Sequence, residues 1–245
     1  MKNLYSCTLI LAFLTASLFG FVSCDSETDL STENVRNGTT YRIANELPGN
    51  DSNPYDEAGW LHNELFETYY ANSIVEGNIS VIAIKVEAIA EANSGFKAIK
   101  SSTYHTVSPE RVQYIIDHKS TCVNDIISTS SLTAPAKSSL SAFITSLVVL
   151  FDNESNCDVL YQFVVDYEKE ILRDTSLSVK DKQIILTTTS IARHSSYLAK
   201  KKPKKNTDPD WTILVANVIA ATEGAEYGMA ESITTGLVAG IAQNN

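Results

Sequence analysis

Apolar residues recur at spacings of three and four along most of the chain, and this period predicts helices. The first predicted helix covers residues 53–71, with Asn53 as its N-cap candidate and Pro54 at its first helical position. Asp56 and Glu57 then supply the acidic residues that a first turn favours. Five residues spaced by three or four share one predicted face: Tyr55, Gly59, His62, Phe66 and Tyr69.

The same period predicts seven further helical segments. β-Branched residues leave a strand over Ile79–Lys85 as an alternative for part of one segment. No pair of segments is joined by an Asn-Gly or Asp-Gly turn, so we predict an all-α protein: a single bundle of about six to eight helices behind a disordered N-terminal tether. The segments cover residues 79–98, 109–127, 135–151, 157–173, 179–202, 211–225 and 229–242.

The first 23 residues have the order of a bacterial export signal, with Lys2 followed by the uncharged apolar stretch Leu4–Phe19. The following residues, Phe21–Cys24, resemble the lipobox of bacterial lipoproteins. The resemblance implies cleavage before Cys24 and lipid attachment to that cysteine, which would anchor the protein to a membrane of the cell envelope, at the outer membrane or cell surface. Ordinary signal cleavage, or an uncleaved anchor, is the alternative.

Residues 24–50 are polar and acidic, and we expect them to form a flexible tether ahead of a helical domain at residues 51–245. The acidic run with Asp25, Glu27 and Asp29 resembles the surface-export signal of lipoproteins from Bacteroidetes. A spacer without any export role explains the same composition.

The charge balance of the chain is strongly acidic. It has 19 basic and 29 acidic residues, a formal net charge of −10, which argues against a nucleic-acid partner. Five lysines gather within residues 200–205. We interpret them as a solvated loop closing a helix, with contact to an anionic surface as the alternative.

Cysteine spacing gives one structural prediction. Cys7 would leave with the signal peptide and Cys24 would carry lipid, so Cys122 and Cys157 remain and could form a disulfide in an oxidising compartment. Two buried free thiols are the alternative. No Cys or His spacing indicates a metal site, and no sequence pattern indicates a cofactor.

One stretch of the predicted first helix carries a recognisable pattern, in which Asn53, Pro54, Tyr55 and Asp56 are followed by Gly59, His62, Asn63 and Glu64. It resembles the N-P-[YF]-D-x-x-G-x-x-H-N-[ED] segment of a family of uncharacterised secreted proteins and lipoproteins, mostly from Bacteroidetes. The resemblance implies no assigned activity.

The chemistry of this motif admits two interpretations. His62 could act as a base together with Asp56 or Glu64, although no nucleophile is evident. Alternatively, Gly59 and His62 face a neighbouring helix, and Asp56 closes the N-cap. The other histidines, His105, His118 and His194, are expected at the surface or the edge of the core, and carboxylates such as Glu168 on solvated helix faces.

Three functional hypotheses follow. The first is a lipid-anchored, non-enzymatic envelope protein that binds a partner or has a structural role. The second is a membrane-active or antagonistic protein acting through its C-terminal helices, in which Gly224, Gly228, Gly236 and Gly240 would allow close helix packing. The third is a hydrolase that uses His62.

Overall fold

The computed structural model describes residues 48–72, 77–118, 121–153, 156–201 and 210–244, and these ranges contain ten α-helices and no strand. The all-α prediction is confirmed. The predicted signal peptide, Cys24, nearly all of the tether and the lysine side chains of 200–205 lie outside the described residues. The helices are α1 (Glu57–Asn72), α2 (Ile79–Ala92), α3 (Ser94–Ile99), α4 (Pro109–Asp117), α5 (Cys122–Thr129), α6 (Ala134–Asn153), α7 (Cys157–Arg173), α8 (Val179–Lys201), α9 (Asp210–Ala225) and α10 (Met229–Gln243).

Two predicted segments are each split into a pair of helices, which raises the number above the six to eight expected. The segment at 79–98 breaks at Asn93, whose extended backbone ends α2 while its side chain accepts the Phe96 N–H at 2.9 Å and caps α3. The segment at 109–127 breaks after α4, where His118 is the C-cap. The alternative of a strand at Ile79–Lys85 is wrong, because these residues lie in α2.

The first helix starts later than its capping signals predict. Asn53 does not cap α1, because its side-chain oxygen accepts the Tyr55 N–H at 2.9 Å and its carbonyl accepts the Asp56 N–H at 3.0 Å. These bonds close a tight turn over residues 53–56. The α-helix therefore begins at Glu57.

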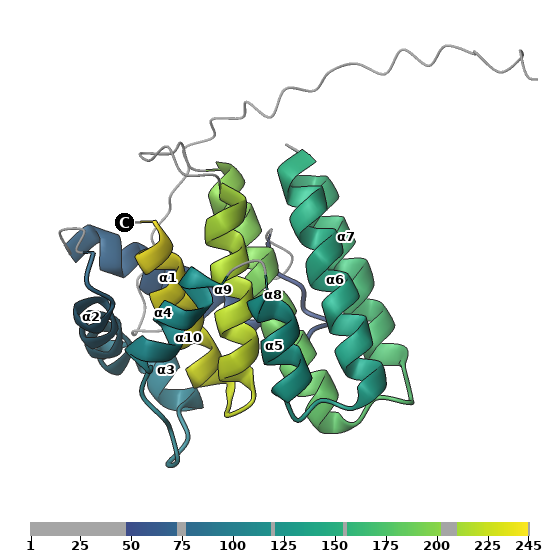
Figure 1. The fold of residues 1–245 in the computed structure, drawn as a ribbon, viewed down its shortest axis with the longest axis horizontal. Helices are drawn as coiled ribbons and strands as arrows, with labels where there is room; N and C mark the ends of the chain where they lie inside the picture. Colours follow the sequence, from purple (N-terminus) through teal and green to yellow (C-terminus); the bar gives the residue numbers. More distant parts are fainter. Residues whose placement is uncertain (1–47, 73–76, 119–120, 154–155, 202–209, 245) are drawn as a thin grey trace, which may run out of the picture. The chain divides into compact units, whose positions relative to one another are not determined.

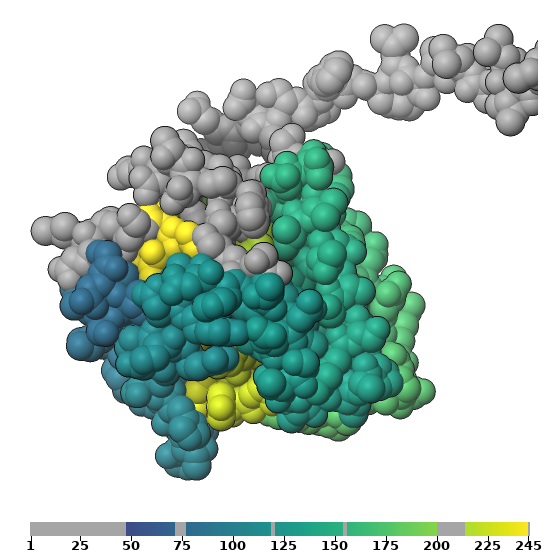
Figure 2. All heavy atoms as spheres, in the orientation of Figure 1, coloured from purple at the N-terminus to yellow at the C-terminus, as the bar shows by residue number. Residues whose placement is uncertain are grey.

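The helices pack around a pair formed by α9 and α10, which we call the central hairpin (Figure 1). Helix α9 contributes to two apolar clusters: Ile219 packs with residues of α1, α2 and α10, whereas Val218 packs with residues of α6, α7 and α8. On the face drawn in Figure 2, the yellow C-terminal atoms emerge only in small areas between the surrounding helices. The C-terminal part of the chain thus forms the centre of the fold.

The two helices of the central hairpin approach closely near their turn. A Cβ atom added to Gly224 would lie 2.4 Å from the Glu231 carbonyl oxygen and 2.7 Å from the Ser232 Cα atom. Ser232 Oγ donates to the Ala221 carbonyl at 2.7 Å across the same crossing. Glycine at position 224 is required because a side chain there would collide with the backbone of α10.

Helices α6 and α7 form the predicted antiparallel pair beside α8 and α9 (Figure 1). Of the described helices, α6 alone has the length and apolar composition to cross a membrane. One side of α6 is nevertheless occupied by the core, since Leu140, Phe143 and Leu147 are buried. Phe143 also stacks on Tyr167 of α7, with ring centroids 4.3 Å apart.

The last three residues of the predicted tether are not free of the domain. Pro48, Gly49 and Asn50 are each hydrogen-bonded to a helix of the domain. The Tyr161 hydroxyl donates to the Gly49 carbonyl at 2.9 Å, and Asn50 Nδ2 donates to Glu168 at 2.6 Å.

Cys122 and Cys157 are free thiols in the structure, so the disulfide suggested by their spacing is not formed. Cys122 is buried at the start of α5, where its thiol lies 3.7 Å from the Ile115 carbonyl. Cys157, at the start of α7, is only half-buried. The helical period placed both on apolar faces, but these faces belong to different parts of the core, because α5 packs on α6 and α9 whereas α7 packs on α6 and α8.

Candidate functional site

The first residues of the motif form a turn that faces α7 and α8. Asn53 is 3% exposed, and its Nδ2 donates to Glu168 Oε1 at 2.8 Å and to the Leu186 carbonyl at 2.9 Å. The amide thus uses both of its N–H groups on α7 and α8, while its oxygen holds the turn. Pro54 is exposed at the tip of this turn. Proline has no backbone N–H, and none is needed at this position.

The carboxylate of Asp56 meets Arg193, not the N-cap that the sequence suggested. Arg193 Nη2 donates to Asp56 Oδ1, and Arg193 Nη1 donates to the Pro48 carbonyl. Trp60 Nε1 also donates to the Asp56 carboxylate, at 3.0 Å from Oδ2. Arg193 is fully buried, so these bonds tie the entry of the domain and the start of α1 to the middle of α8.

Glu168 of α7 completes this arrangement. Its side chain is fully buried and receives hydrogen bonds from Asn53, from Asn50 and from Thr189 Oγ1 at 3.0 Å. Arg193 Nε lies 3.3 Å from Glu168 Oε2. A buried carboxylate is tolerated when it is paired and hydrogen-bonded in this way. We call Asn53, Asp56, Glu168, Thr189 and Arg193 the polar network.

Burial alone would raise the pKa of Asp56. The hydrogen bond with His194 and the charge of Arg193 outweigh that effect, so the pKa of this carboxyl lies below its ordinary value. Asp56 is therefore an anion at neutral pH that is already engaged by three donors. A general base needs a free lone pair that substrate can reach, and Asp56 is a poor candidate for that role.

Gly59 lies at a close crossing of α1 and α8, as the packing interpretation predicts. Its N–H donates to Ser190 Oγ at 3.0 Å, and the same hydroxyl donates to the Asp56 carbonyl at 3.0 Å. A Cβ atom at position 59 would lie 2.2 Å from Cδ2 of His194 and 2.7 Å from the Ser190 carbonyl oxygen. The ring of His194 occupies the space that a side chain would need.

The two catalytic partners suggested for His62 do not reach it. His62 is 1% exposed, and its Nδ1 lies 3.3 Å from the oxygen of the adjacent Asn63. Glu64 is exposed on another side of α1 and accepts a bond from Asn93 at 2.8 Å. Asp56 is bonded to Arg193 and lies 3.4 Å from His194 Nε2. The motif residues His62 and Asp56 thus make contacts inside the protein, and they do not form a catalytic group that is open to solvent.

Several members of the site carried no signal in the sequence. Glu168 was expected on a solvated helix face and His194 at the surface or core edge, but both are fully buried. The described part of α8 places polar residues at 187–190 and again at 193–196, and all of them are buried. Ile185 and Ile191 of α8 do pack in the core, but eight of the ten residues at 187–196 are polar, and this was the available sign that polar contacts also hold α8.

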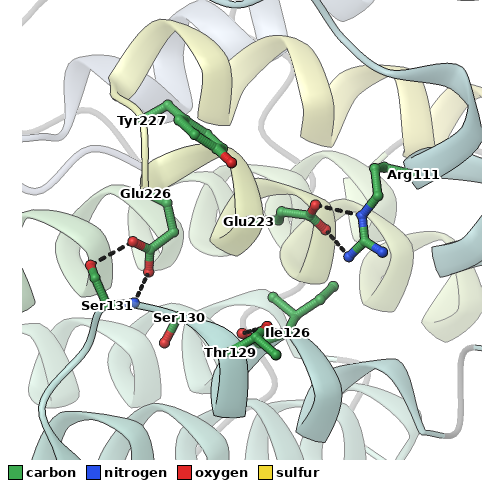
Figure 3. Close-up of a pocket in the computed structure, with 8 residues that line it drawn as sticks. All are labelled: Arg111, Ile126, Thr129, Ser130, Ser131, Glu223, Glu226 and Tyr227. Carbon is green, nitrogen blue, oxygen red and sulfur yellow. Dashed lines mark hydrogen bonds and ion pairs between the residues drawn. The ribbon is translucent and has the colours of Figure 1, made fainter.

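A separate hollow lies at the surface, between the turn of the central hairpin and helices α4 and α5 (Figure 3). Its volume is about 340 Å³. Arg111 binds both oxygens of Glu223, at 2.8 and 3.0 Å, and Glu226 accepts the Ser131 N–H at 3.0 Å and its hydroxyl at 2.5 Å. The carboxylates of this hollow are thus occupied by the protein itself. Its lining residues are Arg111, Ile126, Thr129, Ser130, Ser131, Glu223, Glu226 and Tyr227.

Among the described residues, no three His, Cys, Asp or Glu side chains are grouped so that they could hold a metal ion. The comparisons with known proteins add no relative: no family model, no curated protein and no solved structure matches the chain.

Proposed function

We propose that this chain is a lipid-anchored protein of the bacterial cell envelope whose helical domain is a binding or structural module without catalytic activity. The membrane partner is then its own lipid on Cys24, reached through the polar tether. The resemblance of Phe21–Cys24 to a lipobox and that of the Asn53–Glu64 motif to secreted proteins and lipoproteins of Bacteroidetes support this location.

One observation carries the non-enzymatic part of the proposal: the motif residues are consumed by internal contacts. His62 is buried beside Asn63, Asp56 is paired with Arg193, and Asn53 is bonded to Glu168. Catalysis requires that a base and substrate meet within hydrogen-bond distance. The motif instead fastens the start of the domain to α7 and α8.

Membrane activity through the C-terminal helices has weaker support. Glu223, Glu226 and Glu231 gather around the turn between α9 and α10, so the uncharged part of each helix is shorter than the ~20 residues that span a bilayer. The hairpin is also packed on both sides by other helices. Gly224, Gly236 and Gly240 serve close packing of α9 against α10 inside this fold.

The anchor is tested by labelling the full-length protein with palmitate in a bacterium that processes lipoproteins. Cys24→Ala should abolish both the label and membrane fractionation, because it removes the only proposed attachment atom. Cys7→Ala, a matched change inside the signal, should leave both intact. Palmitate label on the Cys24→Ala protein, or a wild-type protein recovered without membrane, would show the anchor to be wrong.

The absence of an accessible catalytic base is tested by modifying the folded protein with diethyl pyrocarbonate at pH 7 and mapping the adducts by mass spectrometry. His105, whose side chain is 66% exposed, and the exposed His118 should react readily. His62 should react at least tenfold more slowly than either, since burial excludes the reagent. Comparable rates at His62 would contradict a purely internal role and revive the hydrolase hypothesis.

A further inference from the structure

The four histidines of the chain divide into two exposed and two buried residues. His105 and His118 are exposed, whereas His62 on α1 and His194 on α8 are at most 1% exposed. The buried pair is linked, because Asn63 contacts the ring of His62 and donates from Nδ2 to the His194 carbonyl at 3.1 Å. Both rings therefore lie in the contact between α1 and α8.

The hydrogen bonds around His62 fix which ring nitrogen carries the proton. The amide nitrogen of Asn63 donates to the His194 carbonyl, so the amide oxygen faces His62 Nδ1 and accepts from it. The proton is then on Nδ1, and Nε2 is left with a lone pair. This Nε2 is buried and makes no hydrogen bond of good geometry, although the side chain of Asn217 on α9 also lies close to the ring.

His194 has the complementary arrangement. Its Nε2 lies 3.4 Å from Asp56 Oδ1, and an ionised carboxylate can only accept, so Nε2 carries the proton. Its Nδ1 is the buried atom that lacks a partner in the described chain. The ring is closed in by Trp60, with centroids 4.7 Å apart, and by the backbone at Gly59. Protonation of either ring would add a charge and an N–H donor in a site enclosed by protein.

The groups around these rings do not compensate for the cost of burying a protonated histidine. Burial lowers the pKa of His62 to about 4, although Asn63 and Asn217 of α9 act in the opposite direction. Burial also lowers the pKa of His194 to about 4; the charges of Arg193 and His62 add to the effect, and Asp56 opposes it. Glu168 of α7 is bonded to Arg193, and Glu231, the one charged residue of α10, accepts the His105 N–H at 3.1 Å.

We propose that His62 and His194 form an acid-sensitive lock at the junction of α1, α8 and α9. While both rings are neutral, the junction is closed. Protonation of the rings places charge between α1 and α8, separates these helices, and thereby loosens the cover that α1 provides for the central hairpin. The device belongs to the folded domain and does not depend on lipid attachment, so its failure would leave the proposed function untouched.

The direction of the pH effect follows from proton uptake. An unfolded histidine binds a proton near pH 6.5, whereas these two bind it near pH 4 in the folded protein. Above pH 6.5 both rings are neutral in the folded and the unfolded protein, so their burial does not lower the free energy of unfolding. As the pH falls from about 6.5 to about 4, the unfolded protein takes up protons that the folded protein does not, and the folded state loses stability. Asp56 acts in a lower window, because its ionised form is favoured until the pH falls below its ordinary pKa of 3.8.

The test compares thermal unfolding at pH 7 and pH 5 for three forms of the protein. The wild-type melting temperature should fall by roughly 5 to 15 °C across this interval. The His62→Gln/His194→Gln protein should lose less than half as much, because glutamine does not titrate. The matched His105→Gln/His118→Gln protein should fall like the wild type. An equal fall in the buried-pair variant and the wild type would overturn the proposal.

A second measurement on the wild type keeps the proposal testable if the buried-pair variant does not fold. Hydrogen exchange at pH 5, corrected for the intrinsic pH dependence of exchange, should show the amides of α1 opening at least tenfold more than those of the α6–α7 pair. Uniform opening of all helices would contradict a local lock. Ring NMR signals of His62 or His194 titrating above pH 6 in the folded state would contradict it as well.

Discussion

The polar network and the central hairpin both fill the interior of the protein, but different contacts hold them. The network joins Asn53, Asp56, Glu168 and Arg193 through charge-assisted hydrogen bonds in which each group depends on a particular partner. The hairpin joins α9 to α10 through small residues, with Gly224 directly against the backbone of α10.

The difference determines how each region responds to change. In the network, loss of one charged member leaves another charge buried without compensation, which costs more than the lost bond itself. In the hairpin, small residues bring the two helices close together, so the response depends on added volume. One region is specified by the chemistry of its partners and the other by shape.

Arg193→Met tests this comparison with the largest expected effect. Methionine keeps much of the side-chain volume but leaves Asp56 and Glu168 without their cation, and we expect the free energy of unfolding to fall by about 3 to 5 kcal/mol. Urea unfolding at pH 7, followed by circular dichroism, measures the change. Adding Glu168→Gln to the variant should restore part of the loss, because it removes one uncompensated charge.

Arg111→Met is the matched control for that substitution. Arg111 also binds a carboxylate through two hydrogen bonds, but its side chain is 46% exposed and that of Glu223 is 22% exposed. Water solvates both groups once they separate, so we expect a loss of at most about 1 kcal/mol. If Arg111→Met cost as much as Arg193→Met, burial would not be what distinguishes the polar network.

The helical period predicted the bounds of helices in both regions. Helix α7 has the predicted bounds Cys157–Arg173, and α8 and α10 each end within one residue of the prediction, because each segment carries a sustained helical pattern ended by polar residues. The all-α fold followed from these patterns. At Asn93 the apolar residues keep the helical spacing on both sides of the break between α2 and α3, so the pattern predicted one helix where there are two.

The partners in the polar network could not be deduced in the same way. Asn53 and Glu168 are 115 residues apart, and Asp56 and Arg193 are 137 apart, so their pairing depends on how whole helices pack. Glu168 in isolation has the character of a solvated side chain, and only the fold reveals the donors around it. The motif around Gly59 did indicate a close helix crossing, since glycine inside a helix is unfavourable unless something else requires it.

Gly224→Ala tests the other half of the comparison with a smaller expected effect. The added Cβ would meet backbone atoms of Glu231 and Ser232 at 2.4 to 2.7 Å, and backbone cannot move aside as a flexible side chain can. We expect α9 and α10 to be pushed apart at a cost of about 1 to 3 kcal/mol, measured by the same urea unfolding. Gly77→Ala is the matched control, because no atom lies within 4 Å of its added Cβ, and it should change stability by less than about 1 kcal/mol or raise it. A Gly224→Ala protein as stable as the wild type would mean that the crossing can relax without loss, and close contact would then not be what specifies the central hairpin.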